Sequence, residues 1–294
     1  MRNKKVVKYL IAALVVLTTI IFISGCSIDI EKLMEGGQNN NKELVVKFID
    51  VGQADSILVK TPSQKFILID GGSNSGSQDL VNYLKKQGVK TIDVLIGTHP
   101  HEDHIGGIDD IIYSFDIESF YMPKVTTNTN TFKDVLYAAK KKGIKINTAK
   151  SGAPIDIEDG IDIKMVAPIS NKYESLNNYS GVLKMSYGKV SFLFTGDAEK
   201  ISENEMLDNN VDLKSTVLKV GHHGSNTSTT NKFLNSVGPK YAVISCGKGN
   251  DYGHPHKEVI NRLNKKGANI YRTDKDGTIV IATDGDTIKV TKDK

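Results

Sequence analysis

The stretch THPHEDH, residues 98–104, decides the fold of this chain. It follows an apolar run, residues 92–96, that is typical of a buried strand. The stretch is therefore expected in a loop at the carboxyl end of a strand. His99 and His101 are two residues apart, so in an extended loop their side chains point the same way. Neutral imidazole is a common ligand of zinc and related ions, so this pair predicts a metal site.

The same stretch supplies donors for a second ion. Asp103 and His104 turn into a helix expected to start near Ile105, and they can hold a second metal beside the first. The chain has seven histidines, all gathered in short clusters. The other two clusters are GHHGS at residues 221–225 and GHPH at residues 253–256. Such clustering is atypical of surface or core histidines and indicates a shared site.

Strands and helices alternate over residues 44–294. Three β-rich runs at residues 44–50, 56–60 and 65–70, separated by turn residues, predict a meander of short strands. Farther along, strands alternate with helices, twice over. The pattern predicts two sheets faced by helices, and it leaves the strand order open.

His-x-His-x-Asp-His after a strand resembles the signature of the metallo-β-lactamase fold superfamily. Further motifs are similar to one branch of it, the ComEC/Rec2-type hydrolase domain of DNA-uptake proteins. These motifs are FIDVGQADS (48–56), LIDGG (68–72), FTGD (194–197), VGHHGS (220–225) and YGHPH (252–256). The resemblance covers nearly all of residues 44–294. It implies an α/β (α+β) fold, a four-layer αββα sandwich with the metal site at one edge of the two sheets.

The resemblance also implies roles for the site residues. His99 and His101 would bind the first metal, Asp103 and His104 the second, and Asp197 would bridge the two. His222 would complete the second metal. Adjacent residues of a strand face opposite ways, so His222 is preferred over His223, which stays an alternative metal or substrate contact. A helix cap is the alternative role for Asp197.

One departure from the family pattern concerns the first metal. Many relatives supply a third histidine just before the strand that leads to the bridging Asp, but here the stretch, residues 176–180, reads LNNYS. Asn177 or Asn178 is expected to contact the metal or the substrate, or else to open the strand as a turn. With fewer nitrogen ligands, a weakly held zinc or a harder ion such as manganese is expected. The expected cofactors are thus two divalent ions, zinc or manganese.

The expected chemistry is metal-assisted hydrolysis. Two ions about 3.5–4 Å apart can lower the pKa of a shared water. Asp103, beside that water, and His254, protonating a leaving oxygen, are the candidate catalytic residues; His256 is the weaker candidate. Residues near the ligands are expected to orient them or, in the case of Asp70, to form only a turn: Asp50, Gln53, Asp55 and Asp70. Cys246 is expected to be a buried thiol.

The N-terminal sequence has the pattern of an export signal. Basic residues precede an apolar run that is shorter than the ~20 residues of a spanning helix, and Ser-Gly-Cys follows at residues 24–26. This end resembles a bacterial lipobox, which implies a lipoprotein signal peptide at 1–25 and a lipidated Cys26. An uncleaved signal anchor is the alternative. Residues 26–43 are expected to be a flexible tether, and residues 44–294 one hydrolase domain. The protein is then expected on the extracytoplasmic face of a bacterial cell membrane.

Composition narrows the substrate only in part. The net charge of +4 comes from four basic residues within the expected signal peptide, so no global basic field attracts nucleic acid. The resemblance nevertheless points to a phosphodiester, DNA or a related nucleic acid, with residues 140–142 (KKK) either contacting phosphate or forming a solvated helix end. The alternatives are hydrolysis of another ester or lactone at the same site, or a non-catalytic binding lipoprotein.

Overall fold

Alternating apolar residues start the first strand, β1 (Leu44–Phe48), whose burial alternates between full and partial along the strand. The computed structural model describes residues 43–294. The expected signal peptide, Cys26 and nearly all of the expected tether lie outside the described residues. No helix in the described part of the chain is long and apolar enough to cross a membrane.

Two large sheets form the centre of the domain. The first has strand order β16-β15-β1-β2-β3-β5-β7-β8 and the second β14-β13-β12-β11-β10-β9. The first sheet is completed by β2 (Ile57–Lys60), β3 (Phe66–Ile69), β5 (Val94–Ile96), β7 (Phe120–Met122), β8 (Ile146–Thr148), β15 (Ile279–Thr283) and β16 (Ile288–Lys292). The second contains β9 (Ile161–Ala167), β10 (Val182–Tyr187), β11 (Val190–Phe194), β12 (Val217–Lys219), β13 (Tyr241–Ile244) and β14 (Asn269–Arg272). A separate short pair joins β4 (Thr91–Ile92) to β6 (Asp116–Ile117).

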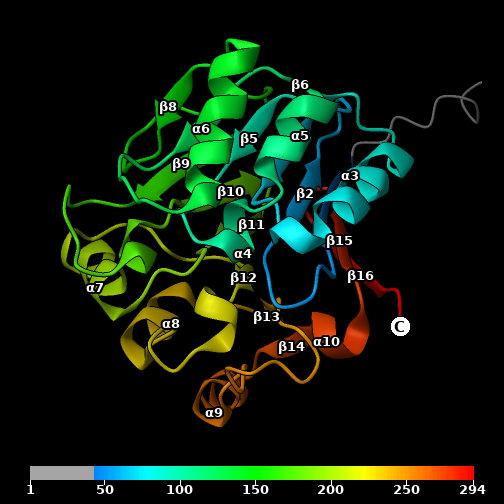
Figure 1. Cartoon of the computed structure of the whole chain (residues 1–294). Coiled ribbons are helices and arrows are strands. Elements are labelled where there is room, and N and C mark those ends of the chain that lie inside the picture. The colour runs from blue at the N-terminus through cyan, green and yellow to red at the C-terminus, as the bar shows by residue number, and fades with distance from the viewer. Residues whose placement is uncertain (1–42) are drawn as a thin grey trace, which may run out of the picture. The chain divides into compact units, whose positions relative to one another are not determined.

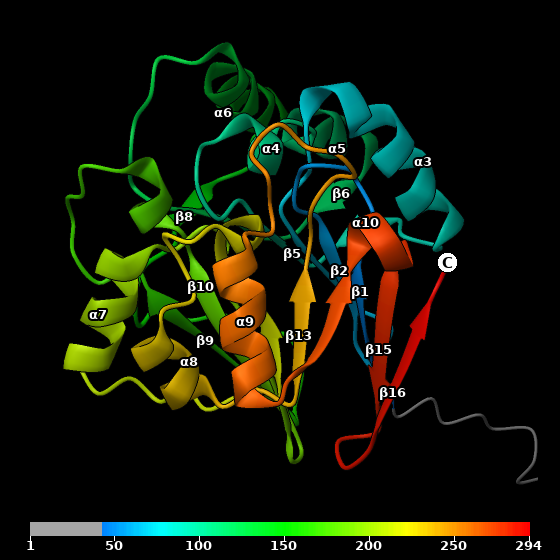
Figure 2. The same cartoon turned by 90° about the horizontal axis from the view of Figure 1, so that it is seen from below.

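Helices cover the outer face of each sheet (Figures 1 and 2). The first sheet carries α3 (Ser77–Lys86), α4 (Glu102–Ile105), α5 (Ile108–Ser114) and α6 (Asn130–Lys142), and the second carries α7 (Lys200–Asp208), α8 (Asn231–Val237) and α9 (Lys257–Lys266). The short α10 (Thr273–Asp276) follows β14. Three 3-10 turns complete the list: η1 (Asn74–Gly76), η2 (Leu176–Tyr179) and η3 (Gly221–Gly224).

Three apolar clusters separate the four layers. One lies between the sheets and includes Phe48 and Phe194, whose ring centroids are 6.2 Å apart. A second packs the first sheet against its helices, and a third packs the second sheet against α7, α8 and α9. The expected αββα sandwich is therefore confirmed.

Parallel strands determine where the loops of interest meet. In the first sheet β3, β5, β7 and β8 run parallel, and in the second β11 to β14 do. The carboxyl ends of parallel strands lie at one edge of a sheet, where polar loop residues from several strands converge. β5 leads to His99, β11 leads to Asp197, and β12 leads to η3. These three segments meet at this edge of the sandwich.

Candidate metal centre

Asp197 lies at the centre of the site. It follows β11 in the FTGD turn, is 2% exposed, and its backbone N–H donates to Ser180 Oγ at 3.0 Å. Its two carboxylate oxygens face different sets of imidazoles. This position agrees with the bridging role that the sequence predicts, and no contact points to the alternative of a helix cap.

A first donor group surrounds Asp197 Oδ2. His99 Nε2 lies 3.9 Å from that oxygen and His222 Nε2 lies 3.6 Å from it. His101 Nδ1 lies 2.9 Å from His99 Nε2. We call His99, His101, His222 and Asp197 Oδ2 the first donor group. His99 and His222 approach the carboxylate oxygen directly, and His101 joins the group through its contact with His99.

A second donor group surrounds Asp197 Oδ1. His104 Nε2 lies 3.2 Å from this oxygen, and His223 Nε2 lies 3.8 Å from it. Asp103 Oδ2 lies 3.1 Å from His223 Nε2. The donor atoms of Asp103, His104, His223 and Asp197 all lie within 4.8 Å of one another. Among the described residues the first donor group does not form so compact a set, so the second is the better assembled of the two.

The structure corrects the assignment of the neighbouring histidines. The sequence argument gave His222 to the second metal and expected only one of the pair to face the site. Both residues adopt left-handed backbone angles, with φ of 49° for His222 and 51° for His223. The alternation of a strand therefore does not apply to them, and both rings face Asp197. His223 joins the second donor group, while His222 fills the place of the missing third histidine in the first.

Unpaired donor atoms test whether these residues fit metal ions. His104 Nε2 and Asp197 Oδ1 are buried and lie 3.2 Å apart, and neither makes a hydrogen bond of acceptable geometry in the described part of the chain. Leaving such atoms without a partner costs about 1–3 kcal/mol each, so a buried pair of this kind calls for a ligand. Two groups of imidazole and carboxylate donors that meet at one shared aspartate are typical of a site for two metal ions. The residues therefore fit two divalent ions.

Hydrogen bonds on the far side of each ring hold the donor nitrogens in place. Asp70 accepts from Thr98 N–H at 2.7 Å, from Thr98 Oγ at 2.8 Å and from His104 Nδ1 at 2.8 Å. His223 Nδ1 lies 3.0 Å from the Ser245 carbonyl oxygen. The bonds at the Nδ1 atoms of His104 and His223 place a proton there and, in the neutral ring, direct the Nε2 lone pair at the site. Asp70 is thus an orienting residue and does not serve only as a turn.

Charge divides the imidazoles of the metal-free protein into two classes. Burial and the neighbouring His104 lower the pKa of His99 well below its ordinary value. Burial also opposes a charge on His104, but the carboxylates of Asp197 and Asp103 outweigh it and raise the pKa of His104 well above its ordinary value. Burial likewise opposes a charge on His223, but Asp197, Asp55 and the hydrogen bond with Asp103 together raise its pKa. The metal-free second donor group therefore holds protons that a metal must displace.

The two asparagines expected at the first metal have different partners. Asn178 Oδ1 accepts from the backbone N–H groups of Glu199 and Ser202 at the start of α7, so Asn178 anchors that helix. Asn177 Nδ2 lies 3.4 Å from Glu199 Oε1 and 3.5 Å from His222 Nδ1. Neither amide contacts His99 or His101 in the described structure. Asn177 acts on the site through His222, together with Glu199, a residue that sequence reasoning missed.

A cavity of about 490 Å³ opens over the donor groups. Its lining comprises Gln53, His101, Glu102, Asp103, Asp197, His222, His223, Tyr252 and His254. Tyr252 is 68% exposed and stacks on His254, with ring centroids 5.6 Å apart. Gly224 has φ +83°, and a Cβ there would lie 2.5 Å from Pro255 Cβ. Glycine at 224 therefore lets the loop carrying His254 close against η3.

The two histidines of the third cluster have different roles, as the sequence suggests, but His254 differs from the expectation in its protonation state. His254 faces the cavity, and its buried Nδ1 has no hydrogen-bond partner among the described residues. Burial, with the neighbouring His222 and His223, lowers the pKa of His254 to about 4. The ring is then neutral at pH 7, so transfer of a proton from an imidazolium does not suit it. His256 instead accepts from the Asn226 backbone N–H at 3.0 Å, outside the cavity lining.

The remaining candidates lie in or outside the centre. Gln53 lines the cavity, and Asp55 Oδ1 lies 3.4 Å from His223 Nδ1. Asp50, by contrast, pairs with Lys294 at 2.8 Å and does not reach the donor groups. Cys246 is a buried free thiol, as expected, and burial beside Asp274 raises its pKa to about 12. Residues 140–142 form the basic last turn of α6, which suits the negative end of the helix dipole.

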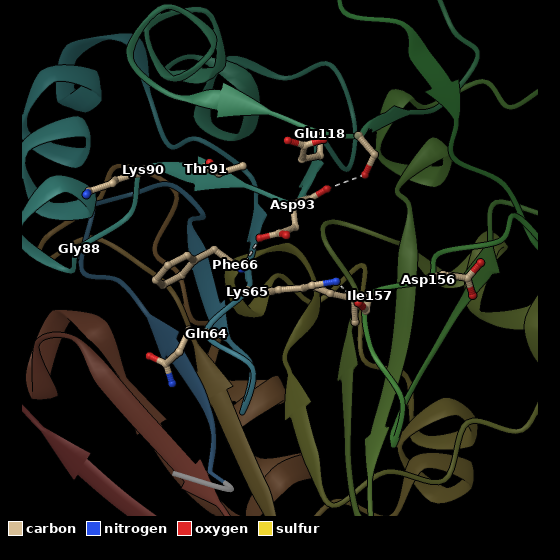
Figure 3. A pocket seen from close by; sticks show the side chains of 11 residues that line it. Gln64, Lys65, Phe66, Gly88, Lys90, Thr91, Asp93, Glu118, Asp156 and Ile157 are labelled. Carbon is tan, nitrogen blue, oxygen red and sulfur yellow. Dashed lines mark hydrogen bonds between the residues drawn. The ribbon is translucent and has the colours of Figure 1, made fainter. Parts of the chain in front are cut away.

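A larger cavity, of about 690 Å³, lies away from the donor groups (Figure 3). Two of its charged groups are already paired: Lys65 Nζ donates to the Ile157 carbonyl oxygen, and Asp93 Oδ2 accepts from the Phe66 backbone N–H at 2.8 Å. It holds none of the chemistry described above. Size alone therefore does not identify the functional site.

Several known proteins are similar to this chain in sequence. A family model described as "Metallo-beta-lactamase superfamily" matches residues 49–248. ComE operon protein 3 of Bacillus subtilis (strain 168) is 37% identical over 251 residues, covering 80% of this chain and 32% of that protein. Competence protein ComA of Neisseria gonorrhoeae is 32% identical over 244 residues, covering 81% of this chain and 32% of that protein. The chain thus spans about a third of the length of these relatives.

Solved structures agree at the level of the fold. CmlA, a diiron beta-hydroxylase from Streptomyces venezuelae, is 12% identical with a TM-score of 0.52, and covers 78% of this chain and 52% of that chain. A structure from Parabacteroides distasonis is 18% identical with a TM-score of 0.51, and covers 79% of this chain and 93% of that chain. At these identities the likeness concerns the αββα architecture alone.

Proposed function

This chain belongs to the metallo-β-lactamase superfamily of metal-dependent hydrolases, in the branch of the ComEC/Rec2-type competence proteins, and from that premise we propose that it is a phosphodiesterase acting on nucleic acid at the outer face of a bacterial membrane. One observation supports hydrolysis above the others: the two carboxylate oxygens of Asp197 face different donor groups. The substrate class is supported by the named relatives, and the location by the lipobox-like stretch before Cys26.

The donor groups have separate tasks in this reaction. His99, His101 and His222 would hold one ion, Asp103, His104 and His223 would hold the other, and Asp197 would serve both donor groups. When bound, two divalent ions activate water and neutralise charge on the attacked phosphoryl group. Imidazole-rich donors suit zinc, and the two carboxylates of the second donor group also accept manganese.

Residues of the chain position the reacting groups. Asp70 and Thr98 hold the His104 ring through Nδ1, so its Nε2 keeps a fixed direction during turnover. Asp103 is one-third exposed and borders the cavity, so its carboxylate can accept a hydrogen bond from the attacking water. The neutral His254 ring, on the opposite loop, donates a hydrogen bond from its N–H to the leaving oxygen. That role replaces the proton transfer expected from the sequence.

A substrate panel with metal-reconstituted, full-length protein tests the proposal. It contains single- and double-stranded DNA, RNA, cyclic dinucleotides, phosphonate esters and lactones. We expect turnover of the nucleic acids, lost in Asp197→Ala by at least about a hundredfold because both donor groups share that carboxylate. Asp50→Ala is the matched control, since Asp50 pairs with Lys294 away from the centre. Turnover of lactones or non-phosphate esters alone would assign a different substrate class, and no metal-dependent turnover would favour a binding protein.

A further inference from the structure

Two adjoining cavities lie beside the metal centre and take no part in the chemistry described so far. One, of about 590 Å³, has mostly apolar walls, formed by Met122, Pro123, Val125, Phe132, Leu136 and Ile146 among others. The other, of about 560 Å³, is more polar and includes Lys150, Ser170 and Asn171. Three residues line both: Lys124, Thr148 and Tyr179. The two cavities therefore form one divided groove.

The sheet places this groove at the edge that carries the metal ligands. Met122 ends β7 and Thr148 ends β8, and both strands run parallel to β5, which leads to His99. Adjacent strands are about 4.8 Å apart, so the groove begins one to two strand spacings from β5. On its other side Tyr179 belongs to η2, the turn that places Asn177 within 3.5 Å of His222 Nδ1. A chain-like substrate held at the metals can reach it.

The charged residues that line the groove are both positive. Lys124 and Lys150 are exposed, neither has an ion-pair partner in the described part of the chain, and no acidic residue lines either cavity. Glu205, which accepts hydrogen bonds from Ser170 and Tyr173, lies outside the lining. The cavity of Figure 3 differs, because Asp93, Glu118 and Asp156 line it beside its two lysines. Of these two sites, the groove alone presents unpaired cations without carboxylates in its lining.

We propose that this groove is a nucleotide subsite for a single-stranded nucleic acid. Lys124 and Lys150 each bind one backbone phosphate, and the apolar cavity beside α6, with Phe132 and Leu136, receives the base. The inference rests on the proposed function and deepens it by specifying single-stranded nucleic acid as the substrate. A base enters such a cavity only when it is free of a duplex, because unpairing and unstacking it from a duplex costs a few kcal/mol. The enzyme therefore selects single strands.

Binding measurements on the full-length, metal-free protein in detergent test the subsite without cleavage. A fluorescent oligothymidylate of twelve nucleotides, its abasic analogue and the duplex are titrated between 50 and 200 mM KCl. Each phosphate contact on a single strand contributes about 0.7 to the slope of log K against log salt. Lys124→Ala/Lys150→Ala should thus reduce the slope by about 1.4 and weaken binding about tenfold or more near 0.1 M salt. Lys86→Ala/Lys90→Ala, the same charge change at exposed lysines elsewhere, should change neither.

The base cavity is tested by the abasic strand. We expect wild type to bind oligothymidylate at least about fivefold more tightly than the abasic analogue, consistent with base–aromatic stacking. Leu136→Asp, at a position that is 41% exposed, should remove this preference without unfolding the protein.

Equal binding of both strands by wild type, or an unchanged slope in the lysine double variant, overturns the subsite even if the metal-loaded enzyme cleaves DNA. Failure of the proposed function shows separately, as intact oligonucleotides after incubation with the metal-loaded enzyme. If the groove lysines instead bind only a base-free polymer such as poly(glycerol phosphate), the nucleotide assignment is wrong.

Discussion

Lys219 Nζ lies 2.7 Å from Asp55 Oδ2, and both side chains are almost completely excluded from solvent. The pair lies directly behind the metal centre, because the other oxygen of Asp55 is 3.4 Å from His223 Nδ1. Lys219 ends β12, two residues before η3 begins. Burying two charges is costly, but removing one partner is costlier still, since the other is left uncompensated. The ion pair therefore couples the stability of the domain to the position of His223.

Lys219→Met is predicted to destabilise the metal-free domain by about 3–5 kcal/mol, the usual cost of breaking a buried pair from one side. Urea denaturation measures this loss. Lys189→Met is the matched control: its ion pair with Asp286 is also 2.7 Å long but is largely exposed, so its loss should cost below about 1 kcal/mol. The double variant Lys219→Met/Asp55→Asn should recover part of the loss. Equal effects of the two Lys→Met changes would contradict the prediction.

His222→Ala and His223→Ala are each predicted to remove one metal ion from the purified protein and to leave the other bound. Each ring belongs to a different donor group, since His222 approaches Asp197 Oδ2 and His223 approaches Oδ1. The loss from His223→Ala should be the more severe for affinity, because the second donor group is the compact one. Metal content by mass spectrometry of the dialysed proteins checks this, with His256→Ala as control. Loss of both ions, or of neither, in either variant would contradict the two-group assignment.

The convergence of ligands at one sheet edge could be predicted from the sequence. His99 and Asp197 each follow a β-rich run directly, and such loops meet wherever the strands are parallel. Strand order could not be predicted, because it depends on contacts between distant segments. β8, three residues long with no fully buried member, has too short a pattern to be read from sequence.

Backbone conformation explains the error at the paired histidines. Strand alternation was a reasonable premise for residues that follow β12, but His222 and His223 both adopt positive φ, which is uncommon for residues other than glycine. Lys219 was missed for a different reason. In the sequence, a lysine at the end of a strand is expected to be exposed to solvent. The contact between Lys219 and Asp55 becomes visible only in the folded structure. For Asn178 the sequence left a metal or substrate contact and a turn before the strand both open, because its partner, the start of α7, is defined by packing.

Cys26→Ser is predicted to release the protein from membranes or to leave an unprocessed precursor, because the lipid would be attached to that sulfur. Fractionation and intact-mass measurement check this. Cys246→Ser is the control, since Cys246 is the buried thiol of the folded domain. Unchanged membrane association and mass in Cys26→Ser would show that the lipobox interpretation is wrong.

His254→Ala is predicted to slow hydrolysis about 10–100-fold for substrates with an alkoxide leaving group, and much less for p-nitrophenyl esters, whose leaving group needs no assistance. The reason is that His254, with a pKa of about 4, is neutral and donates a hydrogen bond at neutral pH. The rate should consequently show no loss between pH 6 and 8 that depends on this ring. kcat for the two substrate types, with His256→Ala as control, decides the point. A uniform effect on both substrates would assign His254 to positioning alone.

Metal binding at pH 7 is predicted to release protons from the protein. In the metal-free state the pKa of His104 is raised well above its ordinary value and that of His223 is raised, so both rings hold protons more tightly than free imidazole, whereas a ligand imidazole must be neutral. Affinity for zinc should therefore fall as the pH is lowered. The same raised pKa makes protonated His104 stabilising below about pH 6.5, an effect lost as the pH rises through its folded value, so the metal-free protein should lose stability in alkali. Calorimetric titration with zinc in phosphate and in Tris measures the protons released, since their ionisation enthalpies differ. His223→Gln should release fewer protons than the parent protein, whereas identical heats in both buffers would show that the rings are already neutral.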